Sequence, residues 1–179
     1  MASASRVVVL LRGVNVGRAK RIAMSDFAAI LAGLGLQDVR TLLNSGNAVG
    51  TTGLAPESLP AAVSASIEDR LGFTCDVVVR TRDEIAAVVA HDPLAAVATD
   101  PSRYLVVFLS SPPASSAIDA LRAIDVGPER WVIEGRELYA WLPAGVNESL
   151  VSKHLAKGVL GVAWTARNVA TVGRVLAAM

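Results

Sequence analysis

The sequence predicts an α+β protein, in which helices pack on antiparallel sheets around a hydrophobic core. Short runs of β-branched and leucine residues, typical of buried strands, alternate with longer segments that carry apolar residues at helical spacing. Glycine, proline and asparagine separate these segments and mark the turns. Hydrophobic residues make up 53% of the 179 residues, which is enough to fill a core of ordinary size.

The chain begins with a predicted strand, helix and hairpin. A strand buried on both faces is expected at residues 7–11, where every residue is valine or leucine. Four apolar residues at helical spacing predict a helix that starts near residue 24 and stops at Gly35: Phe27, Ile30, Leu31 and Leu34. Residues 39–43 and 48–51 then predict a hairpin around the turn Asn44-Ser-Gly-Asn47.

A second helix and a fourth strand complete this unit. Pro56 and Gly72 mark the start and the end of the helix, and an apolar residue recurs at every fourth position between them. A strand is expected at residues 75–80. The order βαββαβ is that of the ferredoxin-like fold, with two helices on one face of a four-stranded sheet of strand order 4-1-3-2.

The second half predicts a similar but incomplete series. A capping box at Thr81 and Glu84 starts a short helix within a helical linker at residues 81–100. A strand at 104–109, a helix after Pro113 and a hairpin of 131–133 with 138–142 follow. Helices are then expected at about 149–160 and from residue 168, so a helix takes the place of the closing strand. We therefore expect a ferredoxin-like subdomain, residues 1–80, packed with a smaller α+β subdomain, residues 81–179, of order βαββα plus a terminal helix.

The loop after the first strand is the strongest candidate for a functional site. The segment Arg12-Gly-Val-Asn-Val-Gly-Arg-Ala-Lys-Arg21 leads from a strand into a helix and carries four cations. Backbone N–H groups and cations gathered in this way suit an anion, for which Arg12, Asn15 and Lys20 would be ligands. The glycine spacing matches neither a P-loop nor a dinucleotide fingerprint. The alternative is a structural role, in which the glycines only supply a turn.

Other polar residues admit both a functional and a structural interpretation. Ser45 and Asn47 could contact a ligand or only form the hairpin turn, and Ser45 lacks a predicted base that would make it a nucleophile. Lys153 could bind an anion or lie on a solvated helix face, and Asn168 could bind or merely cap a helix. The guanidinium of Arg167 suits a carboxylate or phosphate, although a structural pairing is an equal alternative.

Four short motifs together resemble a bacterial family known as domain of unknown function 1697. They are Arg12-Gly-Val-Asn-Val-Gly17, Ser45-Gly-Asn47, Ser152-Lys153 and Thr165-Ala-Arg-Asn168. The resemblance implies two packed α+β subdomains, the first of them ferredoxin-like, and it implies no particular activity. Two positions differ from the family pattern: Arg18 stands where a second glycine is usual, and Asn168-Val-Ala-Thr171 lacks the tryptophan of Asn-Trp-Asn-Thr.

Charge is distributed unevenly along the chain. The net charge is +1, but all sixteen acidic residues lie between Asp26 and Glu148. The first 25 residues carry five cations, and residues 149–179 carry four. If the two ends meet in the fold, they form one positive surface; otherwise they are two separate solvated faces. A net charge this small argues against a nucleic acid partner.

Composition narrows the remaining possibilities. One cysteine and two separated histidines predict no metal site, and no cofactor motif is present. The absence of an export signal and of a long apolar run predicts a cytoplasmic protein without membrane contact. We expect a monomer or weak dimer that binds an anionic or phosphate-bearing small molecule between the subdomains. The alternatives are an enzyme of unknown catalytic residues that uses the same cations to stabilise developing charge, and a protein-interaction module that presents an aromatic patch on the hairpin 131–142.

Overall fold

The computed structural model describes residues 4–179, and its contacts group the chain into two compact units. The first unit comprises the residues up to Ala90 together with Gly173–Met179, and the second unit is His91–Val172. Helix α3 (Arg82–Ala90) contacts two strands of the first unit, β1 and β4. The contacts therefore place these residues with the first unit, where the sequence predicts a linker.

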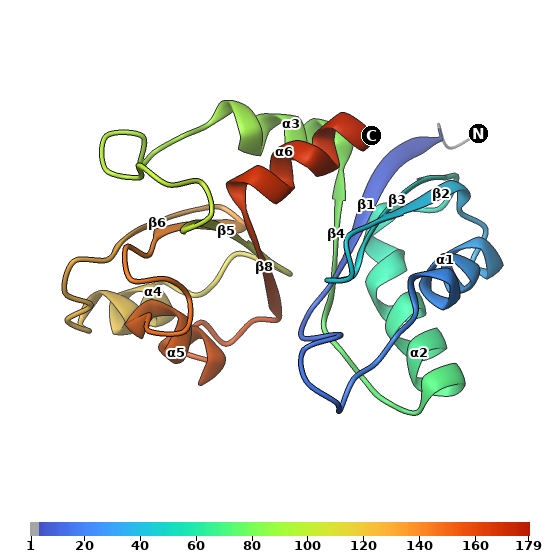
Figure 1. Ribbon diagram of the computed structural model, residues 1–179, viewed down its shortest axis with the longest axis horizontal. Coiled ribbons are helices and arrows are strands. Elements are labelled where there is room, and N and C mark those ends of the chain that lie inside the picture. The colour runs from blue at the N-terminus through green and yellow to red at the C-terminus, as the bar shows by residue number, and fades with distance from the viewer. Residues whose placement is uncertain (1–3) are drawn as a thin grey trace. The chain divides into compact units, whose positions relative to one another are not determined.

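The first unit has the predicted order of elements. They are β1 (Ser5–Leu11), α1 (Met24–Gly33), β2 (Gln37–Leu42), β3 (Asn47–Thr52), a 3₁₀ turn (Pro56–Ser58), α2 (Leu59–Leu71) and β4 (Val77–Thr81). The strands form an antiparallel sheet of order β2-β3-β1-β4, and α1 and α2 lie on one face of it (Figure 1). This confirms the predicted strand order 4-1-3-2 with β1 in the interior of the sheet.

Alternation along β1 explains how this sheet forms a core. Val7, Val9 and Leu11 belong to the hydrophobic cluster that also contains the apolar residues of α1 and α2. Val8 and Leu10 point to the opposite face, since successive side chains of a strand alternate. All five are almost wholly buried, as expected of a strand that is apolar without interruption.

The second unit is also a complete βαββαβ series, which the sequence does not predict. Its elements are β5 (Tyr104–Leu109), α4 (Ser115–Arg122), β6 (Arg130–Glu134), β7 (Glu137–Trp141), α5 (Leu150–Ala156) and β8 (Trp164–Asn168), and α6 (Val169–Ala178) follows. The strands form a sheet of order β6-β7-β5-β8, the same order as in the first unit.

The closing strand β8 corrects two predictions. A helix was expected to take its place, and the preceding helix was expected to reach residue 160, but α5 ends at Ala156. Gly158 and Gly161 both have positive φ, which turns the chain after the helix. Trp164 is the only large apolar residue in β8, so the strand has almost no signature of its own. It forms because it pairs with β5.

The two sheets also share their register. Val8 pairs with Arg80 across β1 and β4, and Val106 pairs with Arg167 across β5 and β8. The bond from Leu11 N to Gly46 O, 2.8 Å, has its counterpart in the bond from Leu109 N to Arg136 O, also 2.8 Å. The second unit therefore repeats the backbone of the first, with a buried arginine at the same position of each last strand.

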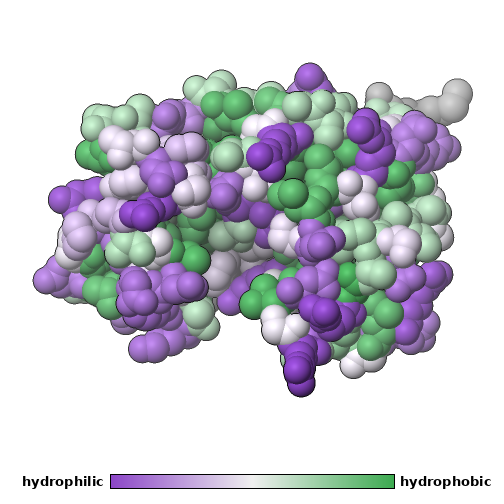
Figure 2. Space-filling view, viewed as in Figure 1, coloured by the Kyte–Doolittle hydropathy of each residue, from purple (hydrophilic) through white to green (hydrophobic). Residues whose placement is uncertain are grey.

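Hydrophobic residues are scattered over the described surface. The face drawn in Figure 2 shows apolar residues interspersed among hydrophilic ones. The large apolar residues that are exposed lie mostly in loops and include no aromatic residue of the hairpin β6–β7. No helix within residues 4–179 has the length and apolar character needed to cross a membrane.

Candidate functional site

The loop between β1 and α1 is held in shape by left-handed backbone and by one asparagine. Gly13, Asn15 and Gly17 all have positive φ, between 57° and 70°. The Asn15 side chain accepts a hydrogen bond from Ile22 N and donates to the carbonyls of Ile22 and Asn44. Its backbone N–H donates to Lys20 O at 2.7 Å. The described contacts of Asn15 therefore organise the loop and attach it to the hairpin turn.

A cavity of about 500 Å³ opens where this loop meets the start of β4. Its lining consists of Arg12, Gly13, Lys20, Ser64, Thr74, Cys75 and Asp76. A volume of this size lies within the range of about 300 to 1,000 Å³ that is usual for small-molecule sites. Of the residues selected from sequence, the structure brings Arg12 and Lys20 together here.

The two cations of the cavity are positioned by different partners. Arg12 forms an ion pair with Asp76, Nη1 to Oδ2 at 2.8 Å, and its backbone N–H donates to Asp76 O. Both side chains are about one-third exposed, so the pair contributes at most about 1 kcal/mol to stability. The Lys20 Nζ donates to Thr74 O at 2.7 Å, which uses one of its three hydrogens. With Asp76 included, the cavity carries a net charge of +1.

Cys75 lies in the wall of the cavity and is buried. Burial raises the pKa of its thiol, and the positive charge of Lys20 opposes that shift only in part. The thiol is therefore protonated at neutral pH, which makes Cys75 a poor nucleophile. Cys75 thus contributes a neutral thiol to the cavity wall.

Ser45 and Asn47 make hydrogen bonds within the hairpin turn. The Nδ2 of Asn47, which is fully buried, donates to Leu42 O and to Ser45 Oγ. Gly46 has φ +80°, and a Cβ there would come within 2.7 Å of the Leu11 Cβ. The described contacts of Ser45 and Asn47 close the turn and hold it against β1. Neither residue lines the cavity.

The three candidates of the second unit have separate environments. Lys153 lies on the exposed face of α5 and donates to Glu148 O. Asn168 Oδ1 accepts from Thr171 N, and thus caps the start of α6. Arg167 is buried in β8 and donates to Thr165 Oγ1 and Ala166 O. Burial lowers the pKa of Arg167 to about 10, so it stays charged at neutral pH.

Sequence reasoning missed the residues that complete the cavity. Ser64 is on α2, and Thr74, Cys75 and Asp76 precede β4, about fifty residues after the loop. The one sequence signal for these residues is Asp76, an acidic residue directly before β4 that could have been expected to pair with a cation such as Arg12. Within residues 4–179 no three histidine, cysteine, aspartate or glutamate side chains are grouped as a metal site would need.

The fold and cavity define a class of α+β protein with two ferredoxin-like sheets and a small polar cavity in the first. The model of the family "Protein of unknown function (DUF1697)" matches residues 4–139, so the chain belongs to this family. Two of the four motifs noted above, at residues 12–17 and 45–47, lie within that match. No curated protein matches the sequence.

A solved structure extends the likeness to the whole chain. It is that of the conserved bacterial protein SP0830 from Streptococcus pneumoniae, with a TM-score of 0.76. The two sequences are 19% identical, and the match covers 98% of this chain and 99% of the other. At this identity the likeness supports the fold and carries no information about a ligand.

Proposed function

We propose that the protein binds a small anionic molecule, such as a phosphate-bearing metabolite, in the cavity between the loop after β1 and the start of β4. The observation that carries the proposal is the Nζ of Lys20, which has donors left after its bond to Thr74 and lies in a cavity of small-molecule size. A group of this kind favours an oxyanion.

The neighbours of Lys20 support the same ligand class. Arg12 adds a second positive charge, and its bond to Asp76 keeps the guanidinium at the cavity wall. Ser64 also lines the cavity, with its hydroxyl donating to Cys75 O, and Gly13 supplies backbone without a side chain in the way. The thiol of Cys75, whose pKa is raised by burial, adds a neutral surface to the cavity wall.

Thermal stability in the presence of inorganic phosphate, ribose 5-phosphate and citrate tests the proposal, with sodium chloride at matched ionic strength as the reference. A ligand at a hundred times its dissociation constant should stabilise the protein by about 2.7 kcal/mol. Lys20→Ala should abolish this stabilisation. Arg18→Ala is the matched control, because Arg18 is an exposed cation of the same loop outside the cavity.

Asp76→Asn should change the affinity for phosphate in the opposite direction from Lys20→Ala, and it therefore distinguishes anion binding from cation binding. Removal of the carboxylate raises the net charge of the cavity from +1 to +2 and should tighten phosphate binding. Equal losses in Lys20→Ala and Arg18→Ala would show that only diffuse charge attracts the anion. Full retention of binding in Lys20→Ala would refute the site.

A further inference from the structure

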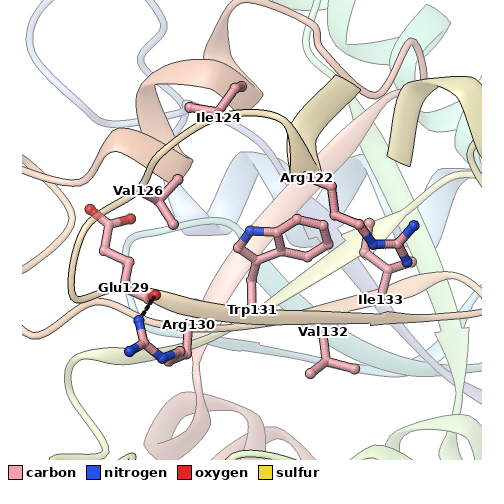
Figure 3. A pocket seen from close by; sticks show the side chains of 8 residues that line it. All are labelled: Arg122, Ile124, Val126, Glu129, Arg130, Trp131, Val132 and Ile133. Atoms are coloured by element: carbon pink, nitrogen blue, oxygen red, sulfur yellow. Dashed lines mark hydrogen bonds between the residues drawn. The ribbon is translucent and has the colours of Figure 1, made fainter. Parts of the chain in front are cut away.

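Strand β6 is an edge strand of the second sheet, and a cavity of about 390 Å³ runs beside it. Four consecutive residues of the strand, Arg130 to Ile133, line this cavity together with Arg122, Ile124, Val126 and Glu129. Figure 3 shows the Trp131 side chain on one side of the strand and the Val132 side chain on the other. The cavity therefore follows the edge of the sheet and takes in both of its faces.

The backbone groups that point away from the sheet at this edge belong to Trp131 and Ile133. The bond from Leu109 N to Arg136 O shows that Arg136 faces β5. The next residue, Glu137, therefore faces β6, and its cross-strand partner Glu134 faces β7. Alternation then turns the N–H and C=O of Trp131 and Ile133 outward. No backbone hydrogen bond from another described segment reaches them.

The corresponding edge of the first sheet is protected, whereas β6 is regular. Strand β2 has a register shift between Gln37 and Arg40, and Asp38 there has φ +51°. A bulge of this kind bends the strand and disfavours its pairing with another strand. The pairing of β6 with β7 runs without interruption from Arg130 to Glu134.

The sequence of β6, Arg-Trp-Val-Ile-Glu, is complementary to itself in the antiparallel direction. A second copy placed with its centre at Val132 sets Arg130 opposite Glu134 and Trp131 opposite Ile133. The same placement makes Trp131 and Ile133 a hydrogen-bonded pair, which matches the outward direction of their backbone groups. The register, the charge pairing and the direction of the backbone groups therefore all favour antiparallel pairing of two β6 strands centred at Val132.

We propose that β6 is the pairing surface for a second copy of this chain, which joins two second-unit sheets into one of eight strands. Four backbone hydrogen bonds form across the two-fold axis, two for each Trp131–Ile133 pair. The Trp131 and Ile133 side chains, which pack against the core of their own unit, line the cavity beside each strand, and two Arg130–Glu134 ion pairs close the ends. Glu134 is about half exposed despite its contact with His91, so its carboxylate remains within reach of a partner.

A disulfide at the centre of the strand tests the register directly. Val132 meets its own copy as a non-hydrogen-bonded pair, for which the Cα–Cα distance is about 4.5 Å, within the range of a disulfide. Val132→Cys should therefore yield a covalent dimer on mild oxidation. Arg130→Cys is the control, because two copies of residue 130 lie about 13 Å apart in this register. The wild-type protein should not cross-link, since Cys75 is buried.

Charge reversal tests the same arrangement without a cross-link. Sedimentation analysis should show a concentration-dependent dimer of the wild-type chain. Arg130→Glu or Glu134→Arg puts like charges opposite each other at both ends and should weaken the dimer roughly tenfold. The double variant R130E/E134R should restore it. Melting temperatures close to wild type would show that each variant is folded.

Several results would overturn the proposal. They are a monomer at every soluble concentration, equal cross-linking of both cysteine variants, and a dimer that single charge reversals leave unchanged. Binding of β6 to an extended peptide of another protein, with the free chain monomeric, would likewise exclude self-pairing.

Discussion

The two units share a backbone but differ in the side chains at one corner. In the first unit Arg12 N donates to Asp76 O, 3.0 Å, and in the second Ser110 N donates to Ala163 O, 2.8 Å. These bonds occupy the same place in the two repeats. Among the described residues, the first corner carries the ion pair of Arg12 with Asp76, and Lys20 lines the same cavity.

This difference shows that the repeated fold does not by itself create the site. Both units share the strand order, the register and the backbone hydrogen bond to the hairpin turn, which is Leu11 N to Gly46 O in the first unit and Leu109 N to Arg136 O in the second. Function, where it exists, resides in the residues placed on the repeated backbone. The second unit presents instead a regular edge strand, where the first has a bulge. The described parts of the two units thus differ at this corner and at this edge strand.

The largest expected effect tests whether the two cores are equivalent. Leu31 on α1 and Leu121 on α4 are both fully buried. Leu31→Ala and Leu121→Ala should each lower the free energy of unfolding by about 2 to 5 kcal/mol, because each leaves a cavity in a packed core. Denaturant titration measures the loss, and hydrogen exchange assigns it to one sheet. A change below roughly 1 kcal/mol in either variant would show that its helix contributes little to that core.

The next largest loss of stability is expected in the hairpin turn of the first unit, compared with the turn of the second. Gly46→Ala should cost about 2 to 4 kcal/mol, because the new Cβ clashes with Leu11 and Val14 and the residue needs a left-handed backbone. Its counterpart Arg136 has no positive φ, and Arg136→Ala should cost less than about 1 kcal/mol. Thermal unfolding of both variants decides the matter. Equal losses would mean that the turn of the first unit is not specially constrained.

The smallest loss of stability is expected from substitutions at the starts of helices α5 and α2. Glu129 is buried, and its carboxylate accepts hydrogen bonds from Ser149 Oγ, Leu150 N and Val151 N at the start of α5. The amide of Glu129→Gln cannot accept all three, so we expect a loss of about 1 to 3 kcal/mol. Helix α2 begins without a side-chain cap, and Ser58→Ala should change stability by less than about 0.5 kcal/mol. Urea titration of the two variants tests this contrast.

The sequence predicts much of the first unit because its signals are local. The apolar run at Val7–Leu11 forms a strand wherever it lies, and Gly35 and Gly72 terminate helices through their own backbone freedom. The strand order follows from the order of elements and short connections. Arg12 and Lys20 of the basic loop line the same cavity, and their role in binding an anion stays a prediction.

Only the tertiary structure determines the closing strand of the second unit and the partners of the polar side chains, because the contacts involved join residues far apart in the chain. Strand β8 forms through pairing with β5, about sixty residues earlier, and Asp76 meets Arg12 across a similar interval. The same holds for Glu129 at the start of α5. Local propensity determines most of the helices and strands of the first unit, whereas β8 depends on its pairing with β5. Long-range packing determines which polar groups meet, as Arg12 and Asp76 do beside the cavity of the first unit.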